Sequence, residues 1–101
     1  MVYHIVMWKF KPEIKEDEKP ALKKAMAENL KALVGKVPGL RTVEFVETPL
    51  PSSTHDVALV TTLERPEDVE IYAGHPEHVK AADTYIRPYM TERVCLDYEV
   101  R

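Results

Sequence analysis

Apolar and polar side chains alternate along residues 2–10, and this period of two predicts a β-strand near the start of the chain. The residues on one face are Val2, His4, Val6, Trp8 and Phe10, and those on the other are Tyr3, Ile5, Met7 and Lys9. Both faces are largely apolar, so we expect both to be covered in the folded protein.

From about residue 17 to residue 34 the apolar residues recur at helical spacing, which predicts the longest helix of the chain. Gly35 and the pair Pro38-Gly39 end this helix. A segment rich in proline and serine, residues 48–53, reads as a surface loop. The other predicted elements are strands at residues 41–47, 55–63 and 91–99, and helices at residues 66–73 and 76–86.

The predicted order is therefore βαββαβ, with the second helical element split in two. Right-handed crossovers then favour an α+β ferredoxin-like sandwich, with strand order 4-1-3-2 and the helices on one face. We expect residues 1–101 to form a single domain, because the chain contains no repeat or dividing linker. Strands one and three are expected to be parallel neighbours, which would bring His4 and His55 to the same end of the sheet.

Composition narrows the function classes. A net charge of −3, with 45% hydrophobic and 31% charged residues, is ordinary for a globular domain and gives no reason to expect nucleic acid as a partner. No apolar run approaches the roughly 20 residues that cross a membrane, so the protein is most simply cytoplasmic. Cys95 is the single cysteine and reads as a small strand residue rather than a nucleophile.

The segment Tyr72-Ala73-Gly74-His75-Pro76-Glu77-His78 places a phenol and two imidazoles around a break between two helices. Gly74 can take the left-handed conformation that ends a helix, and the proline at position 76 keeps His75 out of the helical region. His78 then falls in the first turn of the next helix, where the positive helix end favours the neutral imidazole. A neutral His78 beside Tyr72 suits general base catalysis, although both residues can equally be structural.

Four motifs occur in a fixed order: Trp8-Lys9-Phe10-Lys11, Val37-Pro38-Gly39-Leu40, Tyr72 followed by His75-Pro76-Glu77-His78-Val79, and Arg87-Pro88 leading to Val94-Cys95-Leu96-Asp97-Tyr98-Glu99. In these motifs the whole chain resembles the stress-responsive A/B barrel family, also called Dabb. The resemblance implies a homodimer in which two four-stranded sheets face each other as a dimeric α+β barrel, and this would cover the second apolar face of the first strand.

In one plant branch of that family, the olivetolic acid cyclases, the members close a linear polyketide by an aldol condensation without a cofactor. The resemblance therefore implies catalytic roles for Tyr72 and His78 and a pocket with His4 and His55 in its wall. Trp8 and Val6 share the His4 face, so we expect them to bind the substrate as well. The bulk of Trp8 leaves two alternatives, an open cavity beside His78 or one that the indole fills.

Three functions follow from these observations. The first is a cofactor-independent cyclase or lyase that acts on a small apolar carbonyl compound. The second is a non-catalytic, stress-related binding dimer, and the third is a heme- or quinol-type monooxygenase with the same barrel fold. We expect no tightly bound metal, heme or flavin, because the sequence lacks a cysteine cluster, a glycine-rich phosphate loop and carboxylates spaced with the histidines as ligands.

Overall fold

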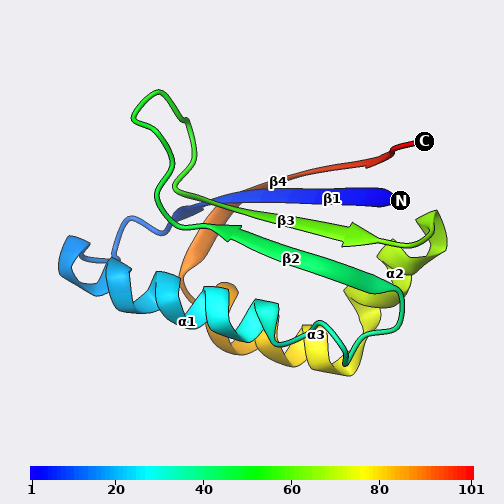
Figure 1. The fold of residues 1–101 in the computed structure, drawn as a ribbon. Helices are drawn as coiled ribbons and strands as arrows, with labels where there is room; N and C mark the ends of the chain where they lie inside the picture. Colours follow the sequence, from blue (N-terminus) through cyan, green and yellow to red (C-terminus); the bar gives the residue numbers. More distant parts are fainter.

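A computed structural model describes all of residues 1–101, with a four-stranded antiparallel sheet whose order is β2-β3-β1-β4. The strands are β1 (Val2–Phe10), β2 (Leu40–Val46), β3 (Val57–Leu63) and β4 (Met90–Glu99), and the helices are α1 (Lys19–Lys31), α2 (Pro66–Gly74) and α3 (Pro76–Ala81). A 3₁₀ turn (Glu16–Glu18) precedes α1, and a π turn (Ala82–Ile86) follows α3. All helices lie on one face of the sheet (Figure 1), so the predicted ferredoxin-like α+β sandwich is confirmed.

The predicted parallel pairing of the first and third strands is wrong, because β1 and β3 run antiparallel. The α1 crossover makes β2 parallel to β1, and the connection from β2 to β3 then reverses the chain, so β3 must run opposite to β1. Val2 consequently pairs with Leu63 at one end of the sheet, and Trp8 pairs with Val57 at the other.

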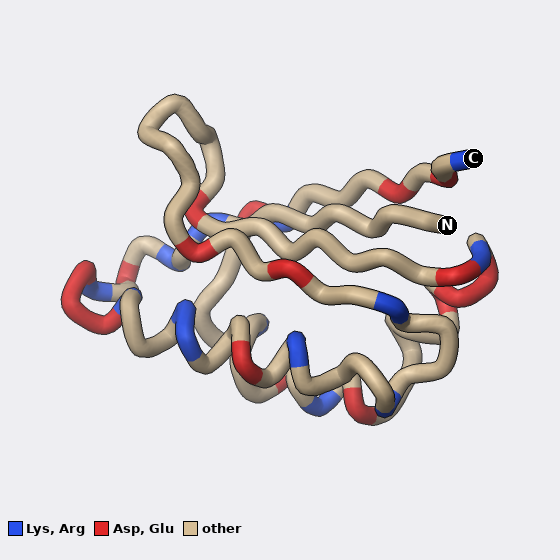
Figure 2. The backbone as a smooth tube through the Cα atoms, in the orientation of Figure 1, with Lys and Arg blue, Asp and Glu red and all other residues tan.

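The core lies between the sheet and α1. Alternate residues of β1 and β3 point toward the helices, and α1 contributes a fully buried face of Met26, Ala27 and Leu30. Figure 2 shows charged residues along α1 and at both ends of β3, but none within β3 itself. None of the helices is both long and apolar enough to cross a lipid bilayer.

Proline, rather than glycine, makes the break between α2 and α3. His75 is extended, with φ −66° and ψ 134°, as the following Pro76 requires. Its Nδ1 accepts a hydrogen bond from the backbone N–H of Glu77 at 3.1 Å, so His75 caps α3. The expectation of a left-handed Gly74 is wrong, since positive φ angles occur among the glycines only at Gly35 and Gly39. Once His75 is extended, no left-handed residue is needed to end α2.

A β-bulge interrupts the pairing of β1 with β4. The register shifts between Met7 and Lys9, so Trp8 faces both Glu92 and Arg93. Glu92 has a φ of 53°, which is unusual for a residue with a side chain. Because one extra residue reverses the alternation of a strand, the bulge decides which residues of β4 face the helices.

Candidate active site between the sheet and the helices

A cavity of about 200 Å³ lies between the sheet and the paired helices α2 and α3. We call it the inner cavity. Its lining residues are His4, Val6, Trp8, Leu30, Leu59, Tyr72, Ala73, His78, Ala82, Ile86, Arg87 and Arg93. Trp8 forms part of the wall and leaves space beside His78, so the indole does not fill the cavity. The fold thus brings together Tyr72, His78, His4, Trp8 and Val6, all of which were singled out in the sequence.

Tyr72 supplies an unsatisfied polar group to this cavity. The residue is completely buried, and its hydroxyl has no hydrogen-bond partner in the protein. Burial raises the pKa of the Tyr72 hydroxyl far above its usual value, so the group keeps its proton. A buried hydroxyl normally has a partner, and this one is free to donate a hydrogen bond to a bound molecule.

His78 packs directly against Tyr72, with 4.3 Å between the ring centroids. Its Nδ1 lies 3.1 Å from the carbonyl oxygen of Ala73, to which it can only donate, so the neutral ring carries its lone pair on Nε2. Burial is the main cause that lowers the pKa of His78, the charges of Arg87, His4 and Arg93 lower it further, and the Ala73 bond opposes them. The expected neutral state is therefore favoured mainly by desolvation, rather than by the helix end.

His4 forms the floor beside Tyr72, and the two ring centroids are 5.8 Å apart with an edge-to-face geometry. The register of β1 and β4 places Asp97 directly opposite His4, and the Asp97 carboxylate accepts a hydrogen bond from Nδ1 of His4. The hydroxyl of Thr61 donates to the His4 carbonyl at 3.0 Å. Thr61 thus holds the backbone of His4 from β3, and Asp97 holds its ring from β4.

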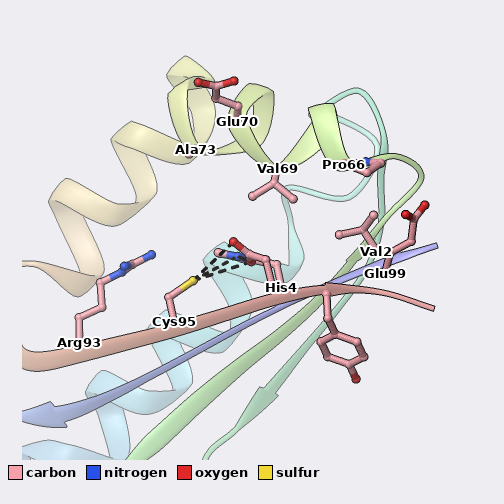
Figure 3. A pocket seen from close by; sticks show the side chains of 11 residues that line it. Val2, His4, Pro66, Val69, Glu70, Ala73, Arg93, Cys95 and Glu99 are labelled. Atoms are coloured by element: carbon pink, nitrogen blue, oxygen red, sulfur yellow. Dashed lines mark hydrogen bonds and ion pairs between the residues drawn. The ribbon is translucent and has the colours of Figure 1, made fainter.

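A second, wider hollow of about 600 Å³ opens from this region between α2 and β4, and we call it the outer cleft. Its residues are Val2, His4, Pro66, Val69, Glu70, Ala73, Arg93, Cys95, Asp97, Tyr98 and Glu99. Figure 3 shows Arg93 and Cys95 rising from β4 toward the helices on the same side as His4. His4, Ala73 and Arg93 line both spaces, so the outer cleft leads to the inner cavity.

Three potential metal ligands meet in the outer cleft. Nδ1 of His4, the Cys95 sulfur and an Asp97 oxygen all lie within 4.8 Å of one another, and zinc uses these ligand types. The sequence argument that no carboxylate accompanies the histidines is wrong, because strand register brings in Asp97. Burial, followed by Asp97, raises the pKa of the Cys95 thiol, which opposes the thiolate that a metal needs. The absence of a tightly bound metal stays a prediction.

His55 does not join the site. It precedes β3 at the end where Trp8 pairs with Val57, whereas His4 pairs with Thr61. Four residues along a strand separate these positions by roughly 13 Å. The His55 ring instead forms a hydrogen bond with the Thr54 hydroxyl at 2.8 Å, in the loop before β3. The antiparallel pairing is the physical reason, and it brings α2 toward His4 because α2 follows the other end of β3.

Sequence reasoning missed Arg87, Arg93 and Asp97. A signal for two of them was present, because Arg93, Cys95, Asp97 and Glu99 form a polar row that alternates with Val94, Leu96, Tyr98 and Val100. Which row faces the helices depends on the bulge at Glu92, and an alternating pattern alone does not specify a bulge.

The stress responsive A/B barrel domain family, Dabb, matches residues 2–100. The chain belongs to this family. A dimeric protein of ferredoxin-like fold from Bacteroides fragilis is 32% identical, with a TM-score of 0.88 over 98% of this chain and 95% of that one. No curated protein matches the chain.

Two more distant structures share the fold of this Dabb domain. One is a dimeric ferredoxin-like protein from Thermobifida fusca, 22% identical, with a TM-score of 0.75 over 98% of this chain and 90% of that one. The other is a hydroxynitrile lyase from Passiflora edulis, 16% identical, with a TM-score of 0.76 over 99% and 93% of the two chains. At these identities the likeness shows the fold alone.

Proposed function

We propose that this Dabb domain binds a small carbonyl compound in the inner cavity and catalyses proton transfer at the carbon next to the carbonyl, without a cofactor. The proposal rests on one observation. A fully buried tyrosine hydroxyl without a partner stands against a histidine that is held neutral, and both line the same cavity.

In the proposed reaction, Nε2 of His78 takes a proton from the carbon, and the electron pair moves into the carbonyl to form an enolate. The Tyr72 hydroxyl donates a hydrogen bond to the oxygen on which the negative charge develops. A positioned general base contributes roughly 10²- to 10⁴-fold and one oxyanion donor roughly 10²- to 10³-fold to such rates. The enolate can then attack a second carbonyl, as in a cyclase, expel a leaving group from the neighbouring carbon, as in a lyase, or take a proton back, so these reactions share the first step.

The size of the site limits the substrate. The inner cavity, at about 200 Å³, is smaller than the roughly 300–1,000 Å³ of drug-sized binding sites. A long polyketide therefore does not fit inside it. We propose a compound of a few carbon atoms, or the reactive end of a larger one whose remainder lies in the outer cleft.

The same proposal includes a homodimer. The face of the sheet away from the helices carries an apolar row on β4, in which Leu96 is 62% exposed and Val94 and Tyr98 are each more than 40% exposed, and Val100, directly after the strand, continues it. Tyr3 stacks on Tyr98 there, at 5.3 Å between ring centroids. A contiguous apolar face of this kind needs a partner, and a stable interface buries roughly 1,600 Å² in total. The dimeric proteins of the same fold support this assembly.

Proton exchange with deuterium tests the proposed chemistry. In D₂O, the wild-type protein should speed the loss of the NMR signals of protons next to the carbonyl in acetylacetone, methyl acetoacetate or acetoacetate. Tyr72→Phe and His78→Ala should each slow exchange by at least about 100-fold. His75→Ala serves as the matched control, because His75 caps α3 and does not line the cavity. Binding without any exchange above that in buffer would instead indicate the non-catalytic binding dimer.

A further inference from the structure

The two connected spaces differ in the balance of charge in their walls. The inner cavity is lined by Arg87, Arg93 and two histidines and by no acidic residue. The outer cleft shares Arg93 and His4 with the inner cavity but adds three acidic residues, Glu70, Asp97 and Glu99. An anionic group is therefore attracted to the inner cavity and repelled at the outer cleft, whereas a cation experiences the reverse.

The two arginines are not equivalent. Arg87 is engaged in an ion pair with Asp83, four residues earlier in the chain. Arg93 takes part in none of the ion pairs of the protein, although its side chain lines both the inner cavity and the outer cleft. Its charge also contributes to the lowered pKa of His78, so it acts on the cavity where the base lies. A guanidinium with this freedom can form paired hydrogen bonds with a carboxylate.

The backbone is distorted to put Arg93 in this place. Met90 faces the helices, as does its partner Phe10, so regular alternation would continue with Glu92 and Val94 on that face. The bulge at Glu92, with its positive φ, makes Arg93 face the helices instead. Such a conformation costs roughly 1–2 kcal/mol, and strained residues of this kind cluster at functional sites.

We infer that the ligand of the inner cavity is a small carboxylate, a β-keto acid or a related keto acid, whose carboxylate binds Arg93. One part of this inference rests on the proposed function, namely that the ketone oxygen accepts a hydrogen bond from the Tyr72 hydroxyl. The ketone of one small molecule then satisfies the Tyr72 hydroxyl, which lacks a partner in the protein, and its carboxylate pairs with the Arg93 guanidinium, which forms no ion pair in the protein.

The test compares acetoacetate with its neutral methyl ester, which has the same reactive carbon. Dissociation constants are measured on the full-length protein by NMR titration, with the Arg93 Nε signal as a local probe. Acetoacetate should bind the wild type at least about 10-fold more tightly than the ester does. Arg93→Gln should weaken acetoacetate binding by at least about 10-fold and leave ester binding unchanged, and Arg93→Lys should give an intermediate loss.

Arg41→Gln is the matched control, because Arg41 lies on β2 in an exposed ion pair with Glu64 and lines neither space. It should leave both affinities unchanged. Equal binding of acid and ester, an equal loss of acetoacetate binding in Arg41→Gln and Arg93→Gln, or no binding of acetoacetate at millimolar concentration overturns the inference.

The inference and the proposed function fail in different ways. Acetoacetate that binds through Arg93 but exchanges no protons leaves the inference standing and contradicts the catalytic proposal. If the ester and the acid exchange protons equally fast, in the wild type and in Arg93→Gln alike, the catalytic proposal stands and the inference about Arg93 is contradicted.

Discussion

Strands β3 and β4 both pair with β1, but the protein uses them in opposite ways. Five of the seven residues of β3 are buried, whereas β4 buries only Met90 of its ten. The helices explain the difference, since α1 covers the half of the sheet that contains β2 and β3 (Figure 1), whereas the outer cleft lies between α2 and β4 (Figure 3). Residues of β3 therefore contribute to stability, and those of β4 are available for binding.

This contrast shows how a small domain can keep a site open. Closing the gap over β4 would bury Asp97 and Arg93, and buried charges are costly unless they are paired. Leaving β4 uncovered keeps these groups partly hydrated while β1 and β3 supply the packed base on which His4 is fixed. The dimer proposed above would cover the opposite, apolar face of β4 and leave the cleft free.

Two leucines, one on each strand, test the difference between β3 and β4 most strongly. Leu63 on β3 is completely buried, and Leu96 on β4 is 62% exposed. Leu63→Ala should lower the free energy of unfolding by about 2–5 kcal/mol, because it removes buried apolar surface and leaves a cavity. Leu96→Ala should instead shift the monomer–dimer equilibrium toward the monomer, since its surface is buried only by a partner. Chemical denaturation at several protein concentrations and sedimentation equilibrium measure the two effects.

A loss for Leu96→Ala that equals that for Leu63→Ala and does not depend on protein concentration would contradict the comparison. It would mean that β4 is packed within one protomer.

A second substitution, at Gly39, tests the packing at the start of α2, the helix that lines the outer cleft. Gly39 has a φ of 81°, and a Cβ there would clash with the carboxylate of Asp68, which is buried at the start of α2. Asp68 accepts a hydrogen bond from the Arg65 N–H at 2.9 Å and so caps α2. Gly39→Ala should therefore lower the unfolding free energy by about 2–4 kcal/mol, through backbone strain and the loss of this cap.

Gly35→Ala is the matched control, because Gly35 also has a positive φ, of 90°, but a Cβ there would meet nothing within 4 Å. It should cost only about 1–2 kcal/mol, the strain alone. Equal losses in the two variants would show that the contact with Asp68 is relieved without cost.

The sequence was sufficient for the fold class and the order of elements, though not for the direction of β3, because each element had its own local signal. The alternation in β1, the helical period of α1 and the prolines at positions 66 and 76 fixed the order of elements, and that order leaves few topologies open. Boundaries were less certain. The predicted helix of residues 17–34 is a 3₁₀ turn, a helix and a series of turns, and Pro20 falls within the first turn of the helix.

The site was only half predictable. Tyr72 and His78 have a local signal in the helix break, and His4 lies on a readable face of β1. Asp97 and Arg93 depend on the register between two strands that are far apart in the chain, and on one bulge. His55 was misplaced for the same reason, since the direction of β3 relative to β1 decides its end of the sheet. Pairing between distant segments is what a single sequence specifies least.

The pKa of His78 reports how strongly the packed side of the site excludes water from the imidazole. Its pKa should be below the ordinary 6.5, because burial and then the nearby positive charges disfavour the imidazolium. The unfolded chain therefore takes up a proton at this residue before the folded one does, so this group lowers stability as the pH falls below about 6.5. Proton exchange catalysed by neutral His78 should persist to a lower pH than an ordinary histidine would allow.

NMR titration of the His78 ring carbon and a pH profile of exchange measure this. In Arg93→Gln the midpoint for His78 should rise, because one of the positive charges that oppose protonation is gone. A midpoint above 6.5 in the wild type would contradict the neutral base.

The smallest expected effect concerns Glu92, whose φ of 53° forms the bulge in β4. Glu92→Gly removes the strain of a side chain in this conformation but makes the unfolded chain more flexible, so the two terms largely cancel and stability should rise by at most about 1 kcal/mol. Glu92→Val should instead lower stability by about 1–2 kcal/mol, because a branched Cβ tolerates a positive φ poorly. Thermal unfolding of both variants measures this, and an equal loss in the two would show that the glutamate side chain, rather than the backbone, holds the bulge. Glycine should also preserve the preference for acetoacetate over its ester, since the orientation of Arg93 depends on the bulge and not on the carboxylate of Glu92.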